Sequence, residues 1–496
     1  MSSTGRPSTS TASTSIGSTP RGTPLDRSRA APEPGQFAVA PCPPQLTGEV
    51  RITCGTLTIT GAAPASIAVA VVHALRAPAR ADPIVFIHGG PGGQAVTSAG
   101  DLFLSSPLSV DRDVIVFDQR GNGLSTPSYE CDVQQPGLAR EALARSDEDP
   151  ASLAVQRASN AACASQLRER GIDPAGLSTA LNARDTAALR RAMGIASWNV
   201  YGSSYGTRIA LTLLRDDPSG VRSVILDSTV PIDQSFFDPE RSVPGLEALF
   251  RACTLTPECE ALHPDLRASW TRELARLRAT PKTLVVPGSP PTTVLLDPER
   301  FVYAFYLALH APSNIPKLPD EIDSPNAELD AAALAAETVP PDGTPDLSAA
   351  TRSVVCNEQP FSVTSAPTDD EVSGGWPARS HFAHDCSGWP VRAVPASDLT
   401  NPRSDVPVLL VNGELDPNTP VVWADRVART LTHSSSFLFP GQTHQVLAAG
   451  GPCPNAMAVA FLDAPNTRPD DSCIAQMPVP LTGLRADRGP RRPRYR

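Results

Sequence analysis

Short runs of apolar residues, most of them closed by glycine-rich turns, are the feature that most constrains this fold. The runs are Pro83–Ile87, Asp113–Phe117, Trp198–Tyr201 and Val221–Leu226. Continuous apolar runs of this length are typical of strands buried on both faces of a sheet. Two stretches with helical character, Ala183–Met193 after an Asn182 N-cap and Thr207–Arg215, lie between them. The alternation predicts an α/β fold with a doubly wound, mostly parallel sheet and functional residues at the strands' carboxyl ends.

The alternation stops near Pro231 and resumes at Val406–Asn412, and the intervening stretches Leu266–Leu277 and Arg300–His310 have helical character. We therefore expect a mainly helical cap inserted into one α/β core. The expected parts are a disordered Ser/Thr/Pro-rich tail at 1–36, the first part of the core at 37–235, the cap at 236–395, the C-terminal part of the core at 396–480, and a basic tail at 481–496.

Composition excludes several classes of protein. Hydrophobic residues make up 41% of the chain, which is enough for a sizeable core. The net charge of −10 disfavours nucleic acid as a partner, because an acidic surface repels phosphate. No apolar run approaches the ~20 residues that cross a membrane, so we expect no membrane span. The oligomeric state stays open.

The ten cysteines fall into close pairs along the chain. They form either five local disulfides, paired in sequence order, or a set of reduced thiols, and we favour the disulfides. Disulfides favour an extracytoplasmic or secreted location, although Met1–Pro34 lacks the apolar stretch of a signal peptide. No cysteine spacing fits zinc, and His381 with His384 lacks a third ligand, so we expect no metal and no cofactor.

A G-x-S-x-G motif at Gly202–Gly206 follows one predicted strand directly and precedes a predicted helix. This context is typical of the sharp turn that presents a serine hydroxyl above a sheet, and it makes Ser204 the candidate nucleophile. The alternative is a glycine turn that only packs the helix on the sheet.

A serine nucleophile needs a base, and the base needs a group that orients it. His444 follows the predicted strand Phe437–Phe439, and Asp416 follows the strand Val406–Asn412. Asp227 and Glu414 are rival orienting groups, and His310 is set aside because it falls in the expected cap.

The glycine-rich loop His88–Gly93 follows an earlier strand and predicts a main-chain donor for an oxyanion. A second donor is the N–H of Tyr205, the residue after the nucleophile. A phosphate-binding loop is the weaker interpretation, because no Gly-Lys-Ser/Thr follows the glycines.

Five segments together resemble the prolyl-aminopeptidase-like group of α/β-hydrolases, and the secreted bacterial tripeptidyl aminopeptidases most. They are HGGPGG at 88–93, DQRGNG at 118–123, GSSYGT at 202–207, GELDPNTP at 413–420 and GQTH at 441–444. The likeness spans about residues 37–480.

The resemblance implies Ser204 as nucleophile, Asp416 as orienting acid and His444 as base. It also implies Gly89 or Gly90 as an oxyanion donor beside Tyr205, and a helical cap that shapes specificity. Glu358 is the residue that it implies as the contact for a substrate's free α-amino group.

Three functions follow as hypotheses. The first is an aminopeptidase that releases short N-terminal fragments, of tripeptidyl or prolyl type, through an acyl-enzyme. The second is a carboxylesterase that acts on a small ester or secondary metabolite with the same residues, since the fold does not fix the acyl group. The third is a binding module without activity, which the intact serine, aspartate and histidine disfavour.

Overall fold

The computed structural model describes residues 35–132, 135–146, 149–235, 243–324, 326–337, 339, 349–358, 372, 386–449, 451–477 and 481. The described residues all belong to one compact unit that begins at Pro32. The tails predicted at 1–36 and 481–496 therefore lie almost wholly outside the described residues. The exception at the N-terminal end is Gly35 and Gln36, which already form part of the first strand.

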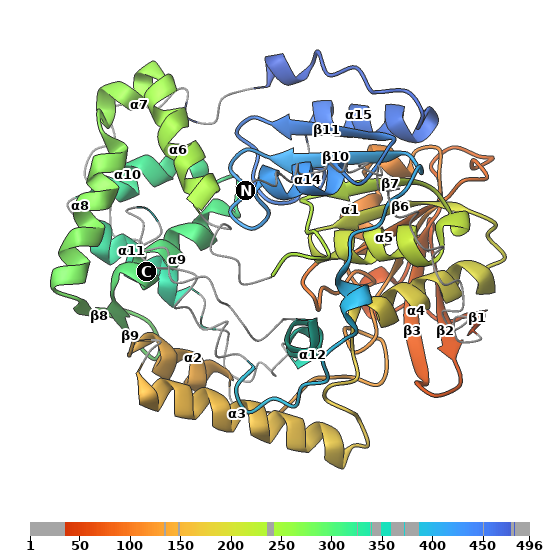
Figure 1. The fold of residues 1–496 in the computed structure, drawn as a ribbon, viewed down its shortest axis with the longest axis horizontal. Helices are drawn as coiled ribbons and strands as arrows, with labels where there is room; N and C mark the ends of the chain where they lie inside the picture. Colours follow the sequence, from red (N-terminus) through yellow and green to blue (C-terminus); the bar gives the residue numbers. More distant parts are fainter. Residues whose placement is uncertain are drawn as a thin grey trace, which may run out of the picture. The chain divides into compact units, whose positions relative to one another are not determined.

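A nine-stranded sheet forms the centre of the fold (Figure 1). Its strands are β1 (Gly35–Val39), β2 (Ile52–Ile59), β3 (Ala65–Val72), β4 (Ile84–Ile87), β5 (Val114–Phe117), β6 (Trp198–Ser203), β7 (Val221–Asp227), β10 (Val408–Gly413) and β11 (Ser434–Phe439). The order is β1-β2-β3-β5-β4-β6-β7-β10-β11. The pairs β1–β2, β2–β3 and β3–β5 are antiparallel, and every pair from β5 to β11 in this order is parallel. The predicted doubly wound, mostly parallel sheet is confirmed.

Alternate residues of a strand point to opposite faces of the sheet, so an apolar strand presents apolar side chains to both faces, and helices cover both. The helices outside the insert are α1 (Ala99–Phe103), α2 (Gln135–Leu143), α3 (Pro150–Glu169), α4 (Thr179–Ala192), α5 (Tyr205–Asp216), α12 (Ala349–Glu358), α14 (Val421–Ala428) and α15 (Pro452–Asp463). One hydrophobic cluster joins one face of the sheet to α3, α4, α5, α12 and α14. A second cluster joins the other face to α1 and α15. The parallel strands are thus buried on both sides, as their unbroken apolar runs predict.

The segment between β7 and β10 forms most of a third hydrophobic cluster, which also includes Leu143 of α2 and Leu415 after β10. Its elements are α6 (Val243–Leu255), α7 (Pro257–Leu262), α8 (Leu266–Ala279), β8 (Lys282–Val286), β9 (Thr292–Leu296), α9 (Pro298–Leu309), α10 (Leu318–Ile322) and α11 (Ala327–Ala336). The segment is mainly helical, but the β8–β9 hairpin was not predicted. Helix α12 also differs from expectation. It lies within the predicted cap range 236–395, yet its buried residues pack in the cluster of the sheet.

Helix α4 begins earlier than the sequence predicts. Its N-cap is Ser178, whose hydroxyl accepts the N–H of Leu181, and not Asn182. Asn182 lies inside the helix and is buried, and its side-chain amide donates to the hydroxyl of Tyr205 at 3.2 Å. A tertiary contact here outweighs the tendency of asparagine to cap a helix.

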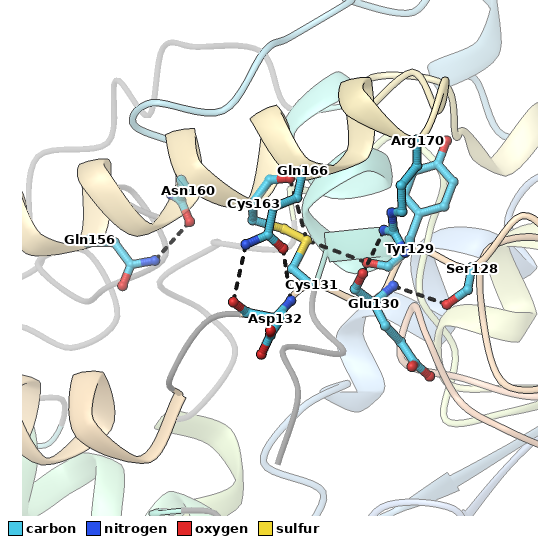
Figure 2. The surroundings of a disulfide bond; sticks show 10 residues. All are labelled: Ser128, Tyr129, Glu130, Cys131, Asp132, Gln156, Asn160, Cys163, Gln166 and Arg170. Carbon is cyan, nitrogen blue, oxygen red and sulfur yellow. Dashed lines mark hydrogen bonds between the residues drawn. A yellow bond between two sulfur atoms is a disulfide. The ribbon is translucent and has the colours of Figure 1, made fainter. Parts of the chain in front are cut away.

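All ten cysteines form disulfides, paired in sequence order as predicted. The pairs are Cys42–Cys54, Cys131–Cys163, Cys253–Cys259, Cys356–Cys386 and Cys453–Cys473. Figure 2 shows the second pair, which joins α3 to the segment after β5. The side chain of Gln166 on α3 supports this junction, because it accepts the N–H of Asp132 and donates to the carbonyl of the same residue.

Within the described ranges, no helix is both long and apolar enough to cross a membrane. The same ranges contain no group of three or more metal-ligating side chains that could hold an ion. His381 and His384 lie outside the described residues.

Candidate active site

Ser204 lies at the turn between β6 and α5 with a φ of 54° and a ψ of −125°. A non-glycine residue rarely adopts this backbone conformation, which is typical of a serine held up at a strand-to-helix turn. The flanking glycines allow the turn. A Cβ on Gly206 would lie 2.0 Å from the carbonyl oxygen of Ile87, and one on Gly202 would lie 2.6 Å from the oxygen of Gly206. From Trp198 to Leu214, Ser204 alone is not buried.

Asp416 and His444 form a hydrogen-bonded pair on the loops after β10 and β11. Nδ1 of His444 lies 3.0 Å and 2.9 Å from the two carboxylate oxygens of Asp416. Asp416 is buried, and its carboxylate also accepts the N–H groups of Asn418 and Thr419 and the hydroxyl of Thr419. Burial alone would raise the pKa of Asp416, but the charge of His444 and these hydrogen bonds lower it to about 2. The acid is therefore ionised and in position to orient the imidazole.

The rival acids have other partners. Asp227 accepts the N–H groups of Val446 and Leu447 and the hydroxyl of Tyr201. Glu414 accepts the N–H of Gly441 and lies 3.5 Å from Arg251. Of the three candidate acids, only Asp416 contacts the imidazole of His444 through a hydrogen bond.

Ser204 is tied to the loop of His444 through Asp227. The N–H of Ser204 donates to the main-chain oxygen of Asp227 at 2.8 Å, and the carboxylate of Asp227 holds the two residues that follow Gln445. Among the hydrogen bonds of the described residues, none joins Oγ of Ser204 to His444. Catalytic hydrogen bonds are often long before substrate binds, so the missing bond does not exclude His444 as the candidate base.

Gly89 is the glycine of the His88–Gly93 loop that lies against the serine. A Cβ on Gly89 would stand 2.7 Å from Cβ and 3.2 Å from Oγ of Ser204. Gly90 is exposed, has a φ of 116°, and its nearest neighbours lie within its own loop. The close approach at Gly89 brings its main chain beside the candidate nucleophile, where an oxyanion donor is needed.

Side chains of three neighbouring residues hold this loop through hydrogen bonds. The side-chain amide of Gln119 donates to the oxygen of His88 at 2.7 Å, and the hydroxyl of Thr351 on α12 donates to the oxygen of Pro91 at 2.5 Å. Asp118 adds a third link, because one of its carboxylate oxygens accepts the N–H groups of Ala95 and Val96 just after the loop.

Tyr205 is the first residue of α5, so its N–H belongs to the first turn of a helix, where N–H groups point out of the N-terminal end along the helix axis and attract negative charge. Its phenol is buried and contacts the side chains of Thr179 and Asn182. Burial raises the pKa of the phenol, which stays neutral.

Glu358 lies at the end of α12, is 4% exposed and has interior partners. Its carboxylate accepts the N–H and the hydroxyl of Thr179, and it lies 3.9 Å from Arg208, which is fully buried. These contacts explain the position of Glu358 without a substrate, so its assignment to an α-amino group stays a prediction.

His310, at the end of α9, is a neighbour of the site that the sequence analysis set aside. Its ring lies edge-to-face with that of His444, with centroids 5.8 Å apart. No periodicity or motif around His310 indicates this contact, because it depends on how the insert folds back onto the core.

The chain matches two protein families. Residues 82–279 match the family described as alpha/beta hydrolase fold, and residues 376–473 match the family described as TAP-like protein. The chain is 25% identical to the serine protease Hip1 of Mycobacterium tuberculosis over 444 residues, which cover 81% of this chain and 83% of that protein.

Over 448 residues it is also 24% identical to the tripeptidyl aminopeptidase of Streptomyces coelicolor, with 81% of this chain and 77% of that protein covered. The mostly parallel sheet with helices on both faces agrees with the match to the alpha/beta hydrolase fold. The chain is therefore an α/β-fold hydrolase with a TAP-like C-terminal part, homologous to the tripeptidyl aminopeptidases and to the serine protease Hip1.

Proposed function

We propose that this hydrolase uses Ser204 as its nucleophile and is an aminopeptidase that releases short N-terminal fragments through an acyl-enzyme. One observation carries the proposal: a partly exposed serine at a strained strand-to-helix turn shares a sheet edge with a hydrogen-bonded Asp416–His444 pair. This combination fits nucleophilic hydrolysis better than any structural role, because a turn that only joined a strand to a helix would not need a strained serine.

In the proposed reaction, Oγ of Ser204 attacks the scissile carbonyl while Nε2 of His444 takes the hydroxyl proton. Asp416 bonds Nδ1, and so directs Nε2 toward the serine and stabilises the imidazolium. The C–N bond then breaks, and the imidazolium returns its proton to the leaving amine. Water attacks the acyl-enzyme in the same way, gives up a proton to His444, and releases the carboxylic acid and the serine.

The oxyanion of each tetrahedral intermediate is assigned to the N–H groups of Gly89 and Tyr205. Support comes from the close contact of Gly89 with Ser204 and from the place of Tyr205 at the start of α5. No cofactor enters any of these steps.

The peptidase part of the proposal is supported by relatives named serine protease and tripeptidyl aminopeptidase, and the exopeptidase part by the latter name alone. We also propose that the insert that carries α6 to α11 is a cap that limits access to the site. The five disulfides support a further proposal, that the protein works outside the reducing cytosol.

The test compares three substrate classes: tripeptide anilides with a free amine, the same anilides with a blocked amine, and simple aryl esters. An aminopeptidase turns over the free anilide much faster than the blocked one, and a Ser204→Ala variant turns over neither. Equal rates on the two anilides contradict the aminopeptidase. Turnover of esters alone, lost in the same variant, identifies a carboxylesterase instead.

A further inference from the structure

The last turn of α9 brings an aromatic face of the insert against the base. Tyr303, Tyr306 and His310 follow one another at helical spacing on one side of this helix, and the rings of Tyr306 and His310 meet edge-to-face at 4.9 Å. The next contact in the series is the one between His310 and His444, at 5.8 Å and an interplanar angle of 72°. The insert therefore reaches the candidate base directly.

His310 is also part of a hydrogen-bond network with the turn that carries the acid. Its Nε2 lies 2.6 Å from the side-chain nitrogen of Asn418, and its Nδ1 lies 3.0 Å from the main-chain oxygen of Tyr306. The hydroxyl of Tyr306 donates to Oδ1 of Asn418. The carbonyl of Tyr306 can only accept and the amide nitrogen of Asn418 can only donate, so His310 carries its proton on Nδ1 and is neutral in this arrangement.

Two further bonds join this network to the catalytic loops. The N–H of Asn418 donates to Oδ1 of Asp416 at 2.8 Å, so the residue that His310 holds also binds the acid. The hydroxyl of Thr443, one residue before His444, donates to the main-chain oxygen of His310 at 3.1 Å. His310 thus contacts the acid turn through its ring, the base loop through its carbonyl, and the base itself through its ring edge.

We propose that His310 is a positioning residue of the hydrolase, which holds the Asp416 turn and the His444 ring in register and couples the insert to the catalytic pair. This inference rests on the proposed function, because it assigns His310 a role through Asp416 and His444. A neutral ring suits the role, since a second positive charge beside His444 would oppose formation of the imidazolium. No part of the reaction requires His310 to exchange a proton.

The experiment uses two substitutions that separate the ring from its hydrogen bond. His310→Phe keeps an aromatic ring against His444 but removes the acceptor for Asn418. His310→Gln removes the ring, yet its amide oxygen can take the place of Nε2 and accept from Asn418. The matched control is His433→Phe, the same change at an exposed histidine that precedes β11. The ring of His433 bonds the carbonyl of Asp405 and lies outside the network of His310.

The first readout is the rate constant for labelling by a fluorophosphonate probe, and the second is kcat and KM on p-nitrophenyl acetate. We expect His310→Phe to lower the labelling rate and kcat about tenfold or more, because His444 loses its alignment. KM should change little, because no contact with the substrate is removed. His310→Gln should recover most of the loss, and His433→Phe should behave as wild type.

A His310→Phe protein that is folded and labels at the wild-type rate overturns the inference, and so does a His310→Gln protein as slow as the Phe variant. If His310→Phe does not fold, Asn418→Ala tests the same link from the other side: slower labelling supports the role, and a wild-type rate overturns it. A wild-type protein that takes no label overturns the proposed function and this inference with it. A labelled wild type with unaffected variants overturns the inference alone.

Discussion

The carboxylate of Asp227 accepts the main-chain N–H of Val446 at 2.9 Å, so the acid that ends β7 holds the loop that carries His444. The N–H of Leu447 binds the same carboxylate at 3.1 Å. The residue that the sequence offered as a rival to Asp416 therefore holds the loop of His444, the proposed base. It is buried, and burial raises its pKa to about 6, although its hydrogen bonds and nearby His444 oppose the change.

We expect Asp227 to make stability depend on pH in an unusual direction for an aspartate. Its pKa in the folded protein lies above the ordinary value of 3.8. Its contribution to the free energy of unfolding is therefore full below about pH 4 and is lost as the pH rises through 6. The difference amounts to about 3 kcal/mol. Asp227→Asn cannot titrate, so the gap in unfolding free energy between wild type and variant should change by that order between pH 4 and pH 8. Urea unfolding at several pH values measures it. A gap that is constant with pH would show that Asp227 keeps an ordinary pKa.

Asp416, whose pKa is lowered instead of raised, leads to a prediction about activity. Its pKa of about 2 keeps it ionised throughout the working range, so the acidic limb of the profile of kcat/KM against pH should contain no inflection from this group above about pH 3. Asp416→Asn should lower kcat by about three to four orders of magnitude, because the imidazole loses the partner that sets its tautomer. Glu414→Gln, two residues away and bonded to Gly441 instead, is the control and should retain activity. Comparable losses in both variants would mean that Asp416 is not the orienting acid.

The elements that the sequence predicts well are those whose residues carry the signal themselves. The runs Pro83–Ile87 and Asp113–Phe117 are apolar at every core position because both faces of a parallel strand are covered, and they form β4 and β5. The proximity of Asp416 and His444 follows from two strand ends at one sheet edge, and the two side chains are hydrogen-bonded. The disulfides follow the sequence order because each pair is close along the chain.

The features that the sequence analysis missed depend on contacts between distant segments. Helix α4 begins before Asn182 because Ser178 caps it, and the contact of the Asn182 side chain with Tyr205 has no signal in the local sequence. His310 looks like any residue at the end of a helix, and only the packing of α9 brings it to His444. The resemblance implied Glu358 as a contact for a substrate's α-amino group, and nothing in the sequence indicated its contacts with Thr179 and Arg208.

The disulfide in Figure 2 should contribute measurably to stability. Cys131–Cys163 closes a loop of 32 residues, and restriction of the unfolded chain by a loop of this length corresponds to about 3–4 kcal/mol. A double Cys131→Ala, Cys163→Ala variant should lose that much free energy of unfolding. The same double change at Cys42–Cys54, whose loop is 12 residues, should cost about 1 kcal/mol less. Denaturant unfolding under non-reducing conditions compares the two. An equal or reversed order would mean that contacts in the folded state outweigh loop closure.

The contact between Gly89 and Ser204 gives the most direct test of the proposed oxyanion site. Gly89→Ala places a methyl group 2.7 Å from Cβ and 3.2 Å from Oγ of Ser204, and the first distance is short enough that the serine or the loop must shift. Because oxyanion donors act only in their aligned position, we expect kcat to fall about a hundredfold while the fold stays intact. Gly137→Ala is the control, since its added methyl group meets no atom within 4 Å and alanine is favoured inside helix α2. Turnover and thermal unfolding of both variants measure the effect. A Gly89→Ala protein with wild-type kcat would place the oxyanion donor on another residue of the loop.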